Sequence, residues 1–207
     1  MTDLAPLLDR IADLRGRAGD ARVLVGVVGS PGSGKSTLCA ALVAALGTDA
    51  VLVPMDGFHL AQAELDRLGR ADRKGAPDTF DAGGYLHLLR RLRAREEDVV
   101  YAPEFHRDLE EAVAGSVAVP REVPVVVTEG NYLLLDDPAW TPVRAELDEA
   151  WFVAPDEALR LERLLARHVA HGRTPDEAHE WVMRNDEANA RLVARSAARA
   201  DLVLRDV

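Results

Sequence analysis

The sequence predicts an α/β protein with a parallel sheet that is covered by helices on both faces. Short runs that are apolar along nearly all of their length lie at residues 23–28, 123–128 and 149–153, a pattern typical of strands buried on both faces. Segments with helical spacing separate these runs, as the connections between parallel strands require. A glycine-rich turn at residues 29–37 joins the first run to a helical segment. With 207 residues, 48% of them hydrophobic, the chain is expected to form one domain over residues 1–207.

The elements of the amino-terminal half follow from apolar spacing and from glycine and proline boundaries. Leucines at helical spacing predict a first amphipathic helix, and an irregular basic stretch before Asp81 predicts a mobile substrate loop. The expected elements are a helix ending near Gly16 or Gly19, a strand at 23–28, a helix at 38–46, a strand at 50–53, a helix at 58–68, the basic loop at 69–78 and a helix from about Asp81.

The carboxyl-terminal half continues the alternation of strands and helices. Thr174 and Glu177 form a capping-box pattern with Pro175 at the first helical position, which predicts the start of a long helix. The expected elements are a small strand pair at 99–101 and 117–119, a strand at 123–128, a helix start at Asp137, a strand at 149–153, a helix from Pro155, a helix from Thr174 to about Ala198 and a closing strand at 202–204.

Residues 29–37 have the spacing of a phosphate-binding loop, with a glycine, four free residues and then Gly-Lys-Ser. The glycines allow unusual backbone dihedrals and leave no Cβ between the backbone and a phosphate. Successive amides then point at the anion together with the positive end of the following helix. Lys35 is expected to reach the terminal phosphates, and the Ser36 hydroxyl to ligate Mg²⁺. The expected phosphate contacts are Gly29, Ser30, Pro31, Gly32, Ser33, Gly34, Lys35, Ser36 and Thr37.

Two acidic residues follow strands of the predicted sheet. Asp56 comes after the second strand, and Glu129 comes directly after the strand that ends at Thr128. Because ligands bind beyond the carboxyl ends of parallel strands, we expect both acids beside the phosphate loop, which makes an inventory for phosphoryl transfer. Asp56 is expected to accept the proton of an acceptor hydroxyl, with Gly57 leaving space for the substrate. Glu129 is expected to hold Mg²⁺ through a bound water.

Three arginines near the carboxyl terminus are expected to close over the β and γ phosphates. They lie in a pair of predicted helices that we expect to form a lid over about residues 160–190. Arg167 and Arg173 are expected to act in catalysis, and Arg163 to bind the nucleotide. The sequence therefore predicts that cations hold the migrating phosphoryl group.

Composition excludes several classes of partner. The net charge of −10 argues against sequence-independent binding of nucleic acid or of an anionic membrane, because both need a cationic surface. The single cysteine, Cys39, cannot form an internal disulfide and is expected to be a small core residue. No apolar run approaches the length of a membrane span, and Met1-Thr2-Asp3-Leu4 carries acid where a secretion signal would carry base. A cytoplasmic location is expected.

The motifs together resemble the superfamily of phosphoribulokinase, uridine kinase and bacterial pantothenate kinase. The resemblance runs from about Val23 onward and is carried by the phosphate loop, Asp56-Gly57-Phe58, Glu129-Gly130 and the arginine-bearing lid. Residues 54–60, 73–81, 129–135 and 185–189 look like the nucleoside/nucleotide kinase-like branch, some members of which are called sugar kinases. The resemblance implies a three-layer P-loop NTPase fold with core strand order 2-3-1-4-5, ATP with Mg²⁺ as cofactors, and Asp56 as catalytic base.

The resemblance also implies that two inserted segments, at about 56–81 and 101–116, contact the acceptor. One departure is that Phe105 is followed by basic residues, where related kinases tend to have an aromatic residue followed by Asp. This leaves the acceptor open. The candidate acceptor contacts are Phe58, His59, Arg73, Lys74, Phe105, His106, Arg107 and Asn131.

The function expected from these observations is an ATP- and Mg²⁺-dependent kinase that phosphorylates a hydroxyl of a small polar metabolite, with a nucleoside ahead of sugar and pantothenate-like acceptors. Two alternatives stay open. One is a nucleoside-monophosphate kinase, because Arg73, Lys74 and Arg107 could hold an acceptor phosphate. The other is a regulatory NTPase, although the sequence contains no Asn-Lys-x-Asp element for reading guanine. A monomer or homodimer is expected.

Overall fold

The centre of the protein is a five-stranded parallel sheet, seen in a computed structural model that describes residues 3–205. The strand order is β2 (Ala50–Pro54), β5 (Val125–Gly130), β1 (Val23–Gly29), β6 (Glu149–Val153) and β7 (Leu202–Leu204). Counted among the core strands alone, this is the expected order 2-3-1-4-5, and the α/β prediction is confirmed. Met1 and Thr2, used in the argument on secretion, lie outside the described residues.

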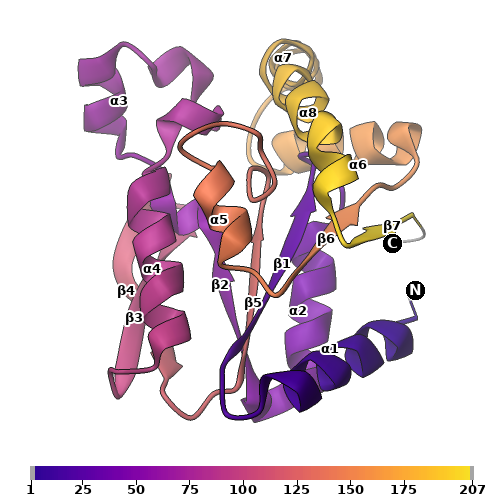
Figure 1. Ribbon diagram of the computed structural model, residues 1–207. Helices are drawn as coiled ribbons and strands as arrows, with labels where there is room; N and C mark the ends of the chain where they lie inside the picture. The colour runs from indigo at the N-terminus through magenta and orange to yellow at the C-terminus, as the bar shows by residue number, and fades with distance from the viewer. Residues whose placement is uncertain (1–2, 206–207) are drawn as a thin grey trace.

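Helices cover both faces of the sheet and make three layers (Figure 1). On one face pack α1 (Ala5–Ala18) and α2 (Lys35–Leu46). On the other pack α4 (Ala82–Ala94), α5 (Thr141–Ala145) and Val193 of α8 (Glu187–Ala194). The seven residues of β1 are all buried and alternate between the two cores, which explains why the strand is apolar along its whole length.

The predicted strand pair is a hairpin that is longer than expected. β3 (Val99–His106) and β4 (Glu111–Pro120) pair antiparallel as a separate two-stranded sheet. The register shifts between Ala102 and Glu104, at a proline that cannot donate to the ladder. Phe105 and His106 therefore end a strand, whereas the sequence analysis ended the expected strand at residue 101 and left His106 in the loop of the pair. The structure corrects that placement.

Two helix boundaries differ from the sequence analysis. The helix expected at 58–68 is divided into a 3₁₀ turn over Met55–Phe58 and α3 (Gln62–Leu68), because His59 pairs with Phe80 in an isolated bridge between them. The helix expected from Asp137 begins at Thr141 instead, since the Asp137 carboxylate accepts a hydrogen bond from the amide of Ala139 at 2.9 Å and holds a turn. Both differences come from contacts that compete locally with a helix.

The lid is made of α6 (Glu157–Ala170) and a second, segmented helix. The capping box at its start is confirmed, because Thr174 and Glu177 exchange hydrogen bonds. The helix expected to run to about Ala198 is divided into α7 (Pro175–Trp181), a π-helical turn over Val182–Asp186, α8 and a 3₁₀ turn over Arg195–Arg199. A π-helical turn carries an extra residue and re-aims the side chains around it.

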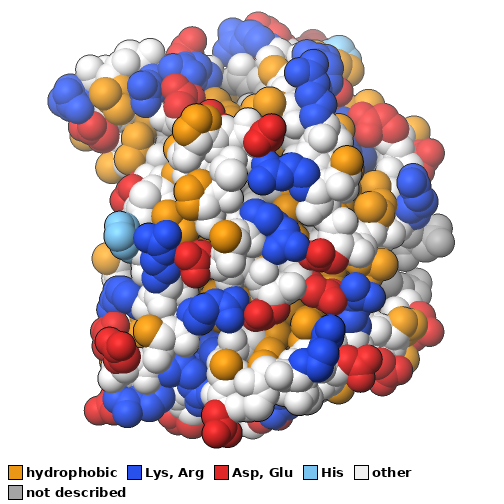
Figure 2. Space-filling view, viewed as in Figure 1, with side chains coloured by type: hydrophobic (Ala, Val, Ile, Leu, Met, Phe, Trp, Pro, Cys, Tyr) orange, Lys and Arg blue, Asp and Glu red, His pale blue; other side chains and the backbone are white. Residues whose placement is uncertain are grey.

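The surface in Figure 2 carries acidic and basic side chains interspersed over the face that is drawn. No continuous basic field, of the kind that tracks a nucleic acid backbone, lies on this face. Among the helices within residues 3–205, none is long and apolar enough to cross a membrane.

Candidate active site

The phosphate loop lies between the end of β1 and the start of α2, and the lid packs against its backbone. Gly32 and Gly34 have φ angles of 81° and 91°, in the left-handed region that favours glycine. A Cβ on Gly32 would lie 2.6 Å from the carbonyl oxygen of Arg160, and one on Gly34 would lie 3.2 Å from the Arg163 guanidinium. These glycines therefore allow a cradle of amides to sit directly under the lid, which fits a polyphosphate.

Ser36 and Glu129 form a pair of oxygen ligands beside Lys35. The Ser36 hydroxyl donates to Oε1 of Glu129 at 3.0 Å, and the Lys35 Nζ lies 3.9 Å from Oε2. Glu129 is only 6% exposed, and burial raises the pKa of its carboxyl group while the charge of Lys35 lowers it. Oε2 is buried and accepts no hydrogen bond from the residues that the structure describes. A hydroxyl and a carboxylate with a spare oxygen are the donors that Mg²⁺ prefers, so this pair fits the ion.

Asp56 stands at the end of β2 in the 3₁₀ turn and lines the same cavity as Lys35. Its Oδ2 lies 3.8 Å from Nη2 of Arg107, and its backbone carbonyl lies 2.7 Å from Nδ1 of His59. The expectation that Gly57 leaves space for substrate is wrong. A Cβ there would lie 2.2 Å from the carbonyl oxygen of Pro103, so the missing side chain makes room for the β3–β4 hairpin.

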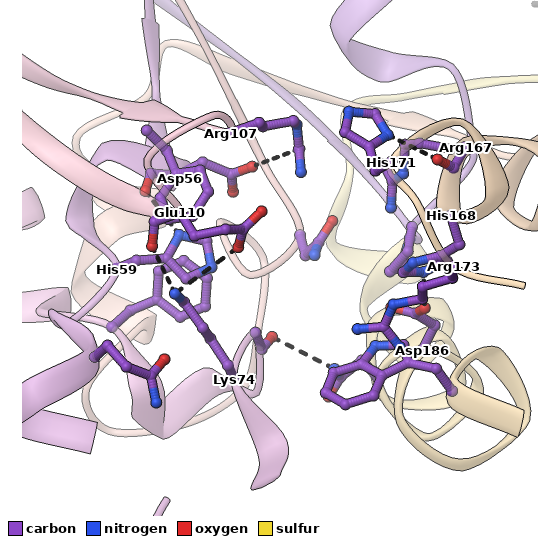
Figure 3. A pocket seen from close by; sticks show the side chains of 18 of the residues that line it. Asp56, His59, Lys74, Arg107, Glu110, Arg167, His168, His171, Arg173 and Asp186 are labelled. Carbon is purple, nitrogen blue, oxygen red and sulfur yellow. Dashed lines mark hydrogen bonds and ion pairs between the residues drawn. The ribbon is translucent and has the colours of Figure 1, made fainter. Parts of the chain in front are cut away.

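The lid brings Arg167 and Arg173 to the cavity, as Figure 3 shows. Burial lowers the pKa of the Arg167 guanidinium. The Arg173 guanidinium lies 4.0 Å from the ring centroid of Trp181, which holds it in place by a cation–π contact. His168 Nε2 lies 2.8 Å from Asp186 in the π-helical turn. The cationic lid predicted from the sequence thus lies across the cavity from Asp56, with Arg163 beside Gly34.

The acceptor side of the cavity has an aromatic wall. The ring of His59 packs against those of Phe80 and Phe105 in tilted arrangements, with centroids 4.0 and 4.7 Å away and interplanar angles of 42° and 47°. Lys74 Nζ donates to the carbonyl oxygen of Glu110 at 2.7 Å and lies 5.4 Å from the Phe105 centroid. The cavity has a volume of about 520 Å³ and is lined by Pro31, Lys35, Asp56, His59, Gln62, Ala71, Lys74, Gly75, Phe80, Phe105, Arg107, Glu110, Asn131, Arg167, His168, His171, Arg173, Trp181, Asp186 and Asn189.

Three candidate acceptor contacts are not among the residues that line this cavity. Phe58 packs edge-on against Tyr85 with ring centroids 5.3 Å apart. Arg73 pairs with Asp78 at 2.7 Å, and His106 lies 3.9 Å from Glu104. Their contact with an acceptor stays a prediction, and in this conformation their side chains serve the packing of the inserted segments.

Sequence reasoning missed Arg160, which is 3% exposed at the base of the lid. Its Nη1 donates to the carbonyl oxygen of Pro31 at 2.9 Å, and its guanidinium also pairs with Glu157 and Glu187. The residue therefore ties the phosphate loop to α6 and α8. Its spacing of four residues from the buried Leu164 put it on the inward stripe of α6, and that signal was present in the sequence.

The basic loop at 69–78 also contacts the lid in a way the sequence did not reveal. Asn185 Nδ2 donates to the carbonyl oxygen of Asp72 at 3.3 Å, and Asn189 Nδ2 donates to that of Gly75 at 3.4 Å. The Tyr132 hydroxyl donates to the same Gly75 oxygen. These contacts join the acceptor-side loop to the π-helical turn and α8 across the cavity.

Comparisons with known proteins agree with this geometry. The profile of the phosphoribulokinase/uridine kinase family matches residues 24–207. A Schizosaccharomyces pombe protein with the provisional name uridine kinase is 35% identical over 197 residues, which cover 90% of this chain and 84% of that protein. The uncharacterized protein YggC of Escherichia coli K12 is 34% identical over 205 residues, 96% of this chain and 84% of that one.

Solved structures show the same fold. A Silicibacter sp. TM1040 protein, provisionally named a fructose transport system kinase, matches with a TM-score of 0.88 and 38% identity over 98% of this chain and 99% of that one. YFH7 of Saccharomyces cerevisiae matches with a TM-score of 0.82 at 21% identity, over 99% of this chain and 98% of that one, and shows the fold alone. Family membership implies ATP binding and usually Mg²⁺. The chain belongs to the phosphoribulokinase/uridine kinase family, and it is a P-loop kinase.

Proposed function

We propose that this kinase transfers the γ-phosphoryl group of ATP to a hydroxyl group of a small polar metabolite, with a nucleoside as the first candidate acceptor. The observation that carries the proposal is the position of Asp56. Its carboxylate lines a single cavity together with Lys35 of the phosphate loop and with Arg167 and Arg173 of the lid. A carboxylate on one side of a phosphate site and cations on the other are what transfer to an alcohol requires.

On the donor side, the amides of residues 29–37 and the Lys35 ammonium would hold the β and γ phosphates. Ser36 and Glu129 would hold Mg²⁺, which neutralises phosphate charge when bound. Arg167 and Arg173 approach from the lid and stabilise the charge that spreads over the migrating group. Arg160 fixes the loop carbonyl of Pro31, so the lid and the cradle keep their relative position.

On the acceptor side, Asp56 would orient the attacking hydroxyl and accept its proton. His59, whose pKa is lowered by burial, presents a neutral ring next to Phe80 and Phe105. Flat faces of this kind stack on a nucleobase or on the apolar face of a sugar. The amide of Asn131, whose Oδ1 accepts no hydrogen bond from the described residues, offers a polar contact to the acceptor.

The relatives support the same range of acceptors. The Schizosaccharomyces pombe protein is named for uridine and the Silicibacter protein for fructose, so nucleosides come first and sugars second. We propose that ATP consumption requires the acceptor. The aromatic wall favours a nucleoside, because its base presents a larger flat face than a sugar does.

The test is a panel of nucleosides, sugars, polyols, pantothenate and nucleoside monophosphates, each offered with Mg-ATP and read by the mass of the product. We expect a gain of one phosphoryl group on a single class of compound. Asp56→Ala should lower turnover by about 100-fold or more while ATP affinity stays close to that of the wild type. Asp136→Ala, at a carboxylate that is 90% exposed, is the control and should leave turnover unchanged.

Normal turnover by Asp56→Ala would contradict the assignment of the base. Phosphorylation of monophosphates alone would replace the proposal with a nucleoside-monophosphate kinase. Equal ATP hydrolysis with and without every compound would replace it with a regulatory NTPase.

A further inference from the structure

Arg107 belongs to the acceptor-side hairpin and lines the same cavity as Lys35 of the phosphate loop. It is the first residue of the turn that follows β3. Its guanidinium lies 3.8 Å from the carboxylate of Asp56, which is the group nearest the reaction in the proposed function. Figure 3 shows Arg107 and Arg167 approaching the cavity from opposite walls. A hairpin residue and a lid residue therefore flank the same space.

The partners of Arg107 do not account for its position. Within residues 3–205 it makes one ion pair, with Asp56, at a distance longer than a hydrogen bond. Its side chain is 49% exposed, so the pair contributes little to stability. Arg167 makes no ion pair within the same residues. The pKa of the Arg167 guanidinium is lowered, first by burial and second by the positive charge of Arg107. Two guanidinium groups thus repel each other across a gap that an anion would fill.

The other cation of the acceptor side has a different environment. Lys74 donates to the carbonyl oxygen of Glu110 at 2.7 Å and lies 3.9 Å from its carboxylate. Lys74 therefore fixes the loop at 69–78 to the turn of the hairpin. Among the described residues Arg107 has no such anchor, and its charge acts on Asp56 and on the buried Glu129, whose pKa it lowers. The phosphates belong beside these two acids in the proposed function.

We propose that Arg107 contacts the γ-phosphoryl group of the bound nucleotide, so that a residue of the acceptor-side hairpin completes the donor site. The inference rests on the proposed function. A planar guanidinium can donate two parallel hydrogen bonds to a phosphate, which the loose pair with Asp56 does not provide. When the nucleotide binds, Arg107 exchanges the Asp56 carboxylate for the phosphoryl oxygens.

The exchange also prepares the acceptor. Asp56, released from Arg107, accepts the proton of the attacking hydroxyl as the new oxygen–phosphorus bond forms and the bond to the bridging oxygen of ADP breaks. Arg107 and Arg167 then hold the migrating group from two sides. Because Arg107 sits on the hairpin with Phe105, acceptor binding and phosphoryl stabilisation share one structural element.

The test uses nucleotide binding alone, so it needs no knowledge of the acceptor. Calorimetric titration compares Mg-ADP with the Mg²⁺ complex of a non-hydrolysable ATP analogue, in the wild type and in Arg107→Ala. We expect the variant to bind the triphosphate analogue about 10- to 100-fold more weakly and ADP as tightly as the wild type. Arg121→Ala is the matched control, because Arg121 lies just beyond the far end of the same hairpin and pairs with the exposed Asp98.

Wild-type affinities of Arg107→Ala for both nucleotides would overturn the inference and return Arg107 to the acceptor. An equal loss for both nucleotides would also overturn it, since only the γ-phosphoryl group separates the two ligands. If the wild type binds neither nucleotide, the proposed function fails and the inference with it. Arg107→Lys keeps the charge without the fork, so we expect an affinity for the triphosphate analogue between those of the wild type and Arg107→Ala.

Discussion

The two ends of the central sheet each bury a charged side chain, and they treat it in opposite ways. At the amino end, Arg22 is 1% exposed directly before β1. Its guanidinium donates four hydrogen bonds of 2.6 to 3.0 Å to the carbonyl oxygens of Leu92, Pro120, Arg121 and Val123. Leu92 lies in the last turn of α4, Pro120 ends β4, and Arg121 and Val123 lie between β4 and β5. At this end of the sheet, the buried charge therefore joins α4, β4 and the segment before β5, and it stabilises the fold.

At the carboxyl end, some buried polar atoms have no hydrogen-bond partner among the described residues. Three buried side-chain atoms in the described chain accept or donate no hydrogen bond, namely Oε2 of Glu129, Oγ of Ser33 and Oδ1 of Asn131. Ser33 belongs to the phosphate loop, Glu129 to the end of β5, and Asn131 follows β5 directly. Because buried polar groups are nearly always satisfied, a cluster of unsatisfied ones marks the place where a ligand completes the structure. The comparison separates charge that serves stability from charge that serves binding.

The largest effect on stability should come from removing the Arg22 guanidinium at the amino end of the sheet. Arg22→Met removes four donors and leaves buried carbonyls unpaired, so we expect the free energy of unfolding to fall by about 3 kcal/mol or more. Nucleotide affinity of the folded fraction should not change. Urea unfolding measures the first quantity and titration the second. Arg17→Met, at an exposed arginine, should stay within about 0.5 kcal/mol of the wild type, and an equal loss there would contradict the special role of Arg22.

At the carboxyl end of the sheet, replacing a buried charged side chain should lower activity and leave stability nearly unchanged. Glu129→Gln keeps the shape and the contact with Ser36 but removes the charge that would position Mg²⁺, so we expect turnover to fall about 10- to 100-fold. The free energy of unfolding should stay within about 1 kcal/mol of the wild type, because a buried carboxylate is itself costly.

Glu149→Gln is the matched control for this prediction. Glu149 is 8% exposed at the amino end of β6, and Oε2 accepts hydrogen bonds from Arg10 and from the indole of Trp151. We expect this variant to lose stability and to keep its turnover per folded molecule. If both variants lose stability alone, the distinction between the two ends is wrong.

A substitution at Gly57 tests how closely the β3–β4 hairpin must pack against the carboxyl end of the sheet. Gly57→Ala would place a methyl group 2.2 Å from the backbone oxygen of Pro103, so the hairpin must shift away from Asp56. We expect a loss of about 1–3 kcal/mol in the free energy of unfolding and a lower kcat, because the shift displaces Phe105 and Arg107 as well. Gly83→Ala, where the nearest atom lies at 3.7 Å, is the control and should be neutral. Unchanged kcat in Gly57→Ala would show that the hairpin tolerates the movement.

The sequence predicted those parts of the protein that rest on local pattern. The apolar runs sufficed for the parallel sheet and the glycine loop for the place of Lys35, because a parallel sheet gathers its ligand residues at one edge. The strand order was implied by the resemblance to a known family, which the same motifs carry. The capping box at Thr174 is likewise a local device, and it was found where the pattern put it.

The parts that sequence missed depend on partners distant along the chain. The spacing of Arg160 from Leu164 indicated that it faces inward, but its contacts with Pro31 and Glu187 come from tertiary packing. The contact of Gly57 with Pro103 likewise comes from tertiary packing. The π-helical turn over Val182–Asp186 interrupts a pattern that reads as continuous helix. The sequence analysis expected Gly57 to leave space for the substrate beside Asp56. In the structure, the missing side chain instead allows Pro103 of the hairpin to approach closely.

The smallest expected effect concerns His59, which is partly buried and also lines the cavity, so it could serve both stability and binding. Burial lowers its pKa, while Asp56 raises it and Lys74 and Arg107 lower it further. An unfolded histidine takes up its proton near pH 6.5 and the folded one does so at lower pH, so the unfolded state binds more protons in between. We therefore expect this residue to lower the free energy of unfolding as the pH falls below about 6.5 and to have no such effect above it. His59→Phe keeps the contact with Phe80 and should show a shallower pH dependence between pH 7.5 and 5.5 in urea unfolding. An unchanged slope would mean that the ring takes up its proton at the same pH in the folded and unfolded states, which would contradict a pKa lowered by burial.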